Sequence, residues 1–243
     1  MQFYKFCSSE LLFCLPFGML EYSYMIDKQL KERKKKAAQI VRELKKLFPK
    51  TKIALNYSNN WELLVTVILS AQCTDKKVNE VTAKLFKKYK TLDDYIRASA
   101  SWRTIQEFQQ DIRSTGFYRN KTKNILKSAK IIKEKFGGKI PKTMEEILTL
   151  PGVARKTANV VLGNAYGVIE GIAVDTHVIR LSRLWGLSNE VNPDKIERDL
   201  MAILPKKEWF LFTYRVIDYG RRYCKAGPHH KHDKCPLRKF YKI

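Results

Sequence analysis

The chain has 243 residues, and its 44% hydrophobic content is ordinary for a globular protein and excludes a chain too polar to build a core. Its 47 Lys and Arg residues against 24 Asp and Glu residues give a formal net charge of +23. Such an excess favours a polyanionic partner, above all nucleic acid, although a ribosome-associated or generally basic protein is the alternative that charge alone leaves open.

The first 24 residues differ in composition from the rest of the chain. Residues 11–20 (LLFCLPFGML) form an apolar run that is too short to span a bilayer. The run resembles a signal peptide only weakly, because Lys5 is the sole positive charge before it and no small-residue cleavage site follows. We therefore expect residues 1–27 to be an extension outside the fold, with translation from Met25 as one explanation for it.

From Asp27 onward, apolar residues recur at helical spacing almost throughout. A basic helix is predicted over residues 31–48. Residues 61–70 (WELLVTVILS) are apolar on nearly every side, which predicts a buried central helix. Thr74 can cap the next helix, and its inward stripe is Val78, Val81, Leu85 and Tyr89. Further helices are predicted over residues 92–99, 101–115 and 121–136.

The second half of the chain continues the same pattern. Thr143 and Glu146 have capping-box spacing at the start of a helix over residues 143–150. Helices follow over residues 154–166, from a cap at Asp175 to residue 185, after a cap at Asn192, and over residues 209–223. Few segments alternate with period two, so the sequence predicts an all-α fold.

Residues 150–162 (LPGVARKTANVVL) are the most informative stretch. Pro151 and Gly152 end one helix, and Gly152 allows a partner to approach the backbone closely. The free N–H groups of the next helix, with Arg155 and Lys156 beside them, form a natural seat for phosphate. On physical grounds alone, an ordinary helical hairpin on a basic protein explains these residues equally well.

This stretch resembles the helix-hairpin-helix of the endonuclease III family of DNA glycosylases. The resemblance runs from about residue 28 to residue 228 and includes residues 69–75 (LSAQCTD), 116–118 (GFY) and 173–178 (AVDTHV), in the family's order. It implies two helical lobes with a DNA cleft between them. Residues 53–168 would form a six-helix barrel domain with the hairpin, and residues 28–52 and 169–243 a second helical domain.

The resemblance implies that Lys156 is the catalytic nucleophile and Asp175 the catalytic aspartate. An amine can attack C1′ of the damaged nucleotide, displace the base and leave a Schiff base, from which β-elimination cuts the strand. Asp175 would stabilise the developing sugar cation and help to activate the lysine or a water. The alternatives are a phosphate contact for Lys156 and a helix N-cap for Asp175, and the capping role is compatible with catalysis.

Lys156 also discriminates between activities, because relatives that only excise a base carry another residue at this position. Its presence favours a bifunctional DNA glycosylase and abasic-site lyase. A monofunctional uracil or thymine mismatch glycosylase is the nearest alternative. A helix-hairpin-helix protein that binds DNA without catalysis is the alternative from another class, but such a protein needs neither Lys156 nor Asp175.

A base inside a duplex cannot reach Lys156, so the nucleotide must be flipped out. The resemblance implies that Gln72 fills the hole and that Phe117 is an apolar wedge between bases. A polar residue at a helix end and a buried core aromatic are the respective alternatives, although the neighbours of Phe117 are typical of an exposed loop. Further DNA contacts are expected from the hairpin residues Gly152, Ala154, Arg155 and Thr157.

The C-terminal region departs from the family pattern of four cysteines that hold a [4Fe–4S] cluster. Cys224 and Cys235 occupy two of the places, and His232 and Tyr241 fall in the others. We therefore expect no iron–sulfur cluster and no other cofactor or metal. Zinc bound by Cys224, His229, His232 and Cys235 is the alternative left open.

The five cysteines are odd in number and scattered, which argues against a disulfide framework and for a reducing compartment. We expect a monomeric, cytoplasmic and nucleoid-associated enzyme without a membrane segment. Its expected partner is double-stranded DNA that contains damaged bases or abasic sites, and oxidised pyrimidines are the substrates that the resemblance implies.

Overall fold

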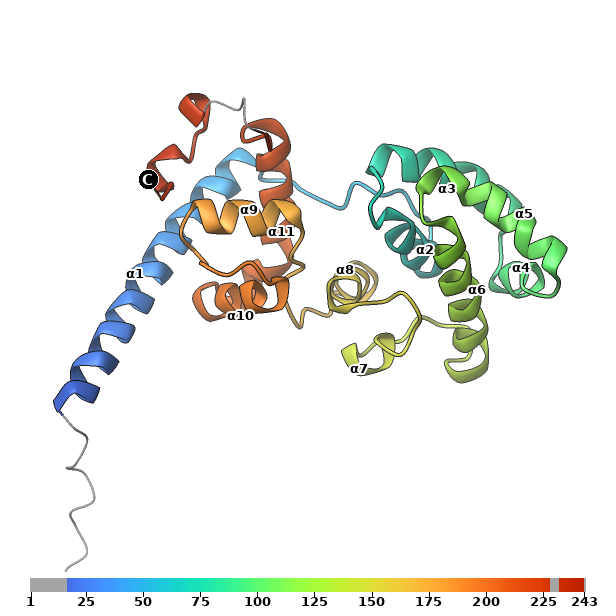
Figure 1. Ribbon diagram of the computed structural model, residues 1–243, viewed down its shortest axis with the longest axis horizontal. Helices are drawn as coiled ribbons and strands as arrows, with labels where there is room; N and C mark the ends of the chain where they lie inside the picture. Colours follow the sequence, from blue (N-terminus) through green and yellow to red (C-terminus); the bar gives the residue numbers. More distant parts are fainter. Residues whose placement is uncertain (1–16, 228–231, 243) are drawn as a thin grey trace, which may run out of the picture.

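The computed structural model describes residues 17–227 and 232–242, and this part of the chain contains helices and no strand. The predicted all-α fold is confirmed. Two lobes stand side by side, and α8 lies where they meet (Figure 1). Each lobe has a hydrophobic cluster of its own. None of the helices described is both long and apolar enough to cross a bilayer.

The first lobe surrounds the apolar helix α2 (Asn60–Ser70), in which seven consecutive residues, from Leu63 to Leu69, are buried. Helix α2 packs against α3, α6 and α8. The predicted central helix is therefore confirmed. The other helices of this lobe are α3 (Asp75–Lys88), α4 (Leu92–Ala98), α5 (Trp102–Ile112), α6 (Tyr118–Lys135), α7 (Met144–Ile147) and α8 (Arg155–Tyr166), with a short 3-10 turn, η1 (Arg113–Thr115), after α5.

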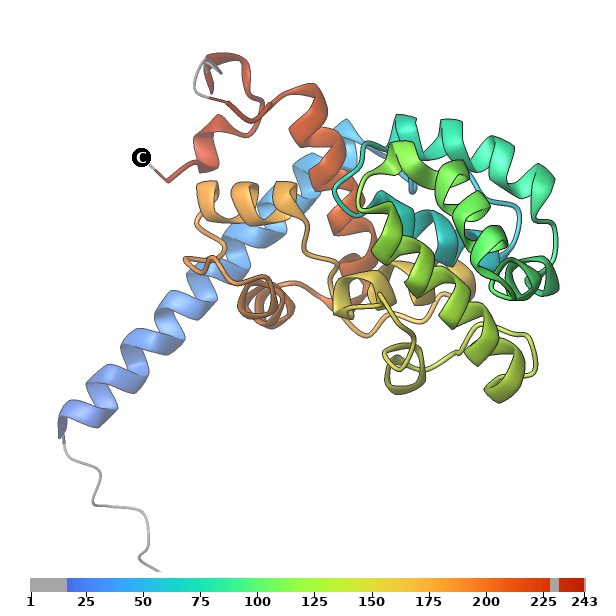
Figure 2. The same ribbon diagram turned by 45° about the vertical axis from the view of Figure 1, so that its right-hand side comes forward.

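The second lobe joins both ends of the described chain. It consists of α1 (Phe17–Leu47), α9 (Thr176–Leu184), α10 (Pro193–Ile203), α11 (Lys206–Arg222) and a C-terminal segment with two 3-10 turns, η2 (His232–Lys234) and η3 (Arg238–Phe240). Leu44, Trp185 and Tyr219 are fully buried in its core. Helix α1 projects beyond the rest of the lobe at its N-terminal end (Figure 2).

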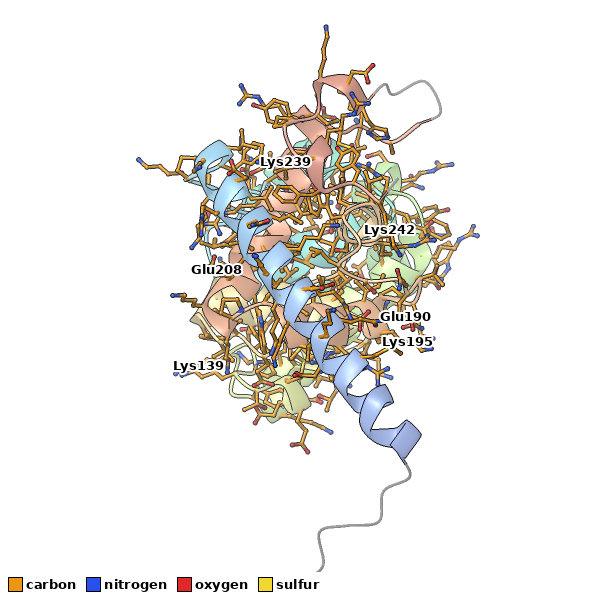
Figure 3. The ribbon with its side chains drawn as sticks, turned by 90° about the vertical axis from the view of Figure 1, so that its left-hand side faces the viewer. Lys139, Glu190, Lys195, Glu208, Lys239 and Lys242 are labelled. Atoms are coloured by element: carbon orange, nitrogen blue, oxygen red, sulfur yellow. The ribbon has the colours of Figure 1, made fainter. Side chains whose placement is uncertain are left out.

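Buried Glu208 fixes α1 against α11. Its carboxylate accepts hydrogen bonds from the Lys45 ammonium of α1 at 2.5 Å and from the Arg215 guanidinium of α11 at 3.2 Å. Glu208 lies beside α1 in Figure 3. Helix α1 begins at Phe17, well before the predicted start at residue 31, because no proline interrupts residues 17–30. Met25 and Asp27 are exposed, and Leu30 is the first residue described as packing on the core.

The predicted caps form as local hydrogen bonds. Thr74 accepts from the Lys77 N–H at 3.3 Å, and Asn192 accepts from the Asp194 N–H at 2.9 Å. Thr143 caps α7, but the Glu146 carboxylate accepts from the Thr143 hydroxyl rather than from its backbone N–H. Helix α7 ends at Ile147, earlier than predicted, because Pro151 has no N–H to donate to the Ile147 carbonyl. The N–H groups of Thr149 and Leu150 instead donate to carbonyls three residues back.

Candidate active site

A cavity of about 480 Å³ lies between the lobes. The C-terminal end of α2 and the first turn of α8 line it from one lobe, while α11 and the segment that leads into α9 line it from the other. Its lining includes Gln72, Lys156, Thr157 and Asp175, which are four of the predicted site residues. A cavity of this size can hold one nucleotide-sized group.

Lys156 is the second residue of α8 and is exposed to the cavity. The N-cap residue, Ala154, has no side chain that can accept from the first-turn N–H groups. The positive end of the helix dipole therefore remains available to an anion beside Lys156. Within the described residues, the Lys156 amine has no hydrogen bond or ion pair, so it is available to a ligand.

Asp175 faces the same cavity from the other lobe, and its side chain is only 14% exposed. One carboxylate oxygen accepts from the Val178 N–H at 2.8 Å, which makes Asp175 the N-cap of α9 as predicted. The other oxygen lies 3.0 Å from Nδ1 of His177. Gly220 on α11 leaves room for the imidazole, since a Cβ there would stand 2.6 Å from His177 Cδ2.

Burial raises the pKa of Asp175, but the opposing influences are larger. The hydrogen bonds from His177 and from the Val178 N–H lower the pKa, and the charges of His177 and Lys156 lower it further. The net pKa of Asp175 is therefore below its ordinary value of 3.8. The cavity thus holds an ionised carboxylate, fixed in orientation, within the electrostatic influence of the Lys156 ammonium.

The hairpin before α8 approaches α6 closely. Gly152 has a φ of +77°, and a Cβ there would meet three atoms of the Asn124 side chain at 2.6–2.9 Å. Both the backbone conformation and the close contact therefore require glycine. Gly152 and Ala154 are exposed to solvent, as a DNA-contacting turn requires.

Arg155 has a different environment from the one predicted. Its Nε donates to Glu197 of α10 at 2.8 Å. Glu197 is buried and also accepts from Asn159 at 2.9 Å and from the Ile172 N–H at 3.1 Å. Arg155 therefore ties the hairpin to the second lobe, because a buried carboxylate needs a compensating cation. Its side chain is still 42% exposed, so a phosphate contact remains sterically open.

Gln72 and Phe117 share an unusual backbone conformation. They are the two non-glycine residues with positive φ in the described chain, at +53° and +48°. Both are exposed, Phe117 at 62%, so the alternative of a buried core aromatic is wrong. Together with Gly152, they line a second cavity of about 170 Å³, and Gln72 lines the larger cavity as well. Side chains held in this region cost about 1–2 kcal/mol each, so the surrounding structure must enforce it.

Lys121 ties together the end of α2 and the turn η1, which directly precede the two loops that carry Gln72 and Phe117. Its ammonium donates to the Leu69 carbonyl and to the Thr115 carbonyl, both at 2.8 Å, and the residue is only 4% exposed. Burial lowers the pKa of Lys121, and a smaller opposing effect comes from Cys73. The sequence prediction missed this residue, although Lys121 lies one helical turn before Ile125 on the inward stripe of α6.

The C-terminal segment brings together Cys224, His232 and Cys235, whose ligand atoms all lie within 4.8 Å of one another. His229, the fourth residue of the zinc set considered from the sequence, lies outside the described residues. The three described residues form a candidate metal site.

Residues 65–206 match the family described as "HhH-GPD superfamily base excision DNA repair protein". The chain is 46% identical over 199 residues to endonuclease III of Synechocystis sp., covering 82% of this chain and 89% of that protein. It is also 46% identical over 192 residues to endonuclease III of Bacillus subtilis, covering 79% of this chain and 84% of that one.

Solved structures also match the chain. The structure of a trapped endonuclease III–DNA covalent intermediate matches with a TM-score of 0.79 and 43% sequence identity, covering 86% of this chain and 95% of that chain. A thermostable thymine-DNA glycosylase matches with a TM-score of 0.69 and 20% identity, covering 89% of this chain and 96% of that chain. The second likeness is one of fold alone.

Proposed function

Because the chain belongs to the endonuclease III family of the HhH-GPD superfamily, we propose that Lys156 and Asp175 are its catalytic residues. The protein is a base excision DNA repair enzyme, a DNA glycosylase and abasic-site lyase that binds DNA. The observation that carries the residue assignment is that the amine and the carboxylate line one cavity from opposite lobes.

Catalysis begins with attack by the Lys156 amine, in its neutral form, on C1′ of a flipped nucleotide. The Nζ–C1′ bond forms as the bond from C1′ to the base breaks, and the departing base takes up a proton. The sugar ring then opens to a protonated Schiff base between C1′ and Lys156. Loss of a C2′ proton and departure of the 3′ phosphate complete the β-elimination, and water releases the lysine.

Asp175 supports the first step electrostatically. Positive charge develops on the sugar as the base departs, and an ionised carboxylate in a partly buried site stabilises it more strongly than water does. The contacts from Val178 and His177 already fix the carboxylate, so little reorganisation is needed at the moment of reaction. His177 is a positioning residue in this scheme.

The exposed loops supply access to the base. We assign Phe117 as the wedge that separates neighbouring bases and Gln72 as the residue that occupies the vacated space. Gly152, Ala154 and Thr157 lie at the hairpin and the first turn of α8, where a phosphate on the flipped strand can accept from backbone N–H groups. Arg155 contributes through the exposed part of its guanidinium while it holds Glu197.

Ring-oxidised pyrimidines are the proposed substrates. They are the usual substrates in this family, and the cavity is large enough for a single modified pyrimidine and its sugar. A panel of duplexes with an oxidised pyrimidine, a uracil or a mismatched thymine tests this assignment. A preference for uracil or thymine without strand cleavage would instead support a monofunctional glycosylase.

Borohydride trapping on abasic duplex DNA tests the residue assignment. We expect wild-type protein to become covalently attached, Lys156→Ala to lose attachment, and Asp175→Asn to slow it by at least a hundredfold. Lys139→Ala is the matched control, since Lys139 is an exposed lysine remote from the cavity lining. Loss of attachment in the control, or full attachment of Lys156→Ala, would contradict the assignment.

A further inference from the structure

The C-terminal segment folds back so that three metal-ligating side chains converge. Nδ1 of His232 lies 3.7 Å from the Cys224 sulfur and 3.8 Å from the Cys235 sulfur. Cys224 is fully buried and Cys235 is 4% exposed, whereas His232 comes from the short turn η2. These ligand atoms come from the end of α11 and from a turn that follows it, so a common ion would join the two.

A [4Fe–4S] cluster does not fit this donor set. Such a cluster is held by four thiolates, and the site offers two. Tyr241 lies beside the same three residues: its ring stands edge-on to the His232 imidazole at 5.1 Å, and its hydroxyl is hydrogen-bonded to the two cysteine side chains and lies 3.1 Å from the hydroxyl of Tyr219. The separations between donor atoms are also those of a site that closes around one ion.

We propose that Cys224, His232 and Cys235 bind a single zinc ion, with the Tyr241 hydroxyl at the fourth side. Zinc–sulfur bonds of about 2.3 Å and zinc–nitrogen bonds of about 2.0 Å in a tetrahedron place sulfur and nitrogen about 3.5 Å apart. Both separations in the structure match this value to within a few tenths of an ångström. Nδ1 of His232 has a single lone pair, so it cannot accept a full hydrogen bond from both thiols at once. An ion between the three atoms can be bound by the nitrogen and by both sulfurs.

The surroundings suit bound thiolates. Arg180 of α9 donates from its guanidinium to the Cys224 sulfur at 3.2 Å and also to the Cys224 carbonyl. A cation that donates to a coordinating sulfur stabilises its negative charge and fixes its position. The Cys235 thiol donates to the Tyr223 carbonyl at 3.1 Å, and zinc would displace this proton on binding.

A bound ion would fix the segment that covers the end of α9. The Lys242 N–H donates to the Leu184 carbonyl, and the Lys242 ammonium donates to Asn189 at 2.7 Å. Lys239 and Lys242 lie on this segment, on the side of the lobe that carries α1 (Figure 3). Zinc therefore has a structural role here, since the cysteines are buried and do not line the catalytic cavity.

Metal analysis of the full chain tests the proposal. The protein is expressed without an affinity tag in medium that supplies both iron and zinc, and its metals are measured by mass spectrometry. We expect about one zinc per chain and no stoichiometric iron or sulfide. His232→Ala and Cys235→Ser should each lower the zinc content at least tenfold, while Cys73→Ser, which removes a cysteine of the other lobe, should keep it.

Cobalt substitution provides a readout on the wild-type chain in case the variants fail to fold. We expect the intense visible bands of tetrahedral Co²⁺ together with sulfur-to-cobalt charge transfer, and displacement of both by one equivalent of zinc. Four irons with sulfide per chain would overturn the proposal. So would wild-type protein that neither contains zinc nor gives the cobalt spectrum, or zinc retained by folded His232→Ala and Cys235→Ser.

Discussion

Replacing Lys121 with methionine tests how the two DNA-facing loops are held. The substitution keeps the length of the side chain but removes the ammonium that donates to the carbonyls of Leu69 and Thr115. Each buried carbonyl left without a donor costs about 1–3 kcal/mol. Removal of the buried charge offsets part of this loss of stability, because the charged ammonium is unfavourable in a buried site, as the lowered pKa of Lys121 indicates. We expect a net loss of about 2–4 kcal/mol in the free energy of unfolding.

The functional loss should depend on the substrate. The positive-φ conformation costs about 1–2 kcal/mol for each residue that adopts it. Without the hydrogen bonds of Lys121, Gln72 and Phe117 can therefore relax out of it. The proposed wedge can act only on a duplex. We therefore expect kcat/KM on an abasic duplex to fall at least tenfold, which corresponds to about 1.4 kcal/mol. On a single-stranded abasic oligonucleotide the fall should be less than threefold.

Thermal unfolding and trapping kinetics on the two substrates measure both effects. The Tm should fall by several degrees, at about 2–4 °C per kcal/mol for a chain of this size. Lys123→Met is the matched control, because it removes one positive charge from the exposed face of the same helix. An unchanged Tm, or equal losses on duplex and single-stranded DNA, would refute the positioning role of Lys121.

Three further predictions follow from single contacts. Gly152→Ala should lower both the Tm and duplex binding, and more than Gly137→Ala, because both glycines have positive φ but only Gly152 has a side chain within 3 Å of the new Cβ. Glu197→Gln should destabilise the chain by about 1–3 kcal/mol in chemical denaturation, since the buried carboxylate accepts from Arg155, Asn159 and the Ile172 N–H, and an amide cannot accept all three hydrogen bonds as well. Phe117→Ala should change the unfolding free energy by less than about 0.5 kcal/mol, because the side chain is exposed. It should nevertheless slow base excision from duplex DNA at least tenfold, and equal rates for wild type and variant would contradict the wedge.

Local signals made most helices predictable. The caps at Thr74, Asp175 and Asn192 depend on a side chain and an N–H group two or three residues away, so short-range spacing is enough to find them. Helix ends were less predictable. The first turn of α1 has no acidic residue to mark it, and the turn ahead of Pro151 shortens α7.

Long-range contacts of the candidate site were not predictable in the same way. Arg155 and Glu197 pair between the two lobes, although they are 42 residues apart in the sequence. In a chain with so many basic residues, the sequence does not indicate which of them a given acidic residue will contact. The positive φ of Gln72 and Phe117 could not be predicted from residue type, because neither residue is glycine. The convergence of Lys156 and Asp175 on one cavity was expected from family resemblance, not from their spacing.

The most direct measurement of the central claim locates the covalent bond. Wild-type protein is reduced with borohydride on an abasic duplex, digested, and the modified peptide is sequenced by mass spectrometry. The account predicts that the sugar remnant is attached to Lys156. Attachment to Lys52, the other lysine that lines the cavity, or recovery of no modified peptide would contradict it.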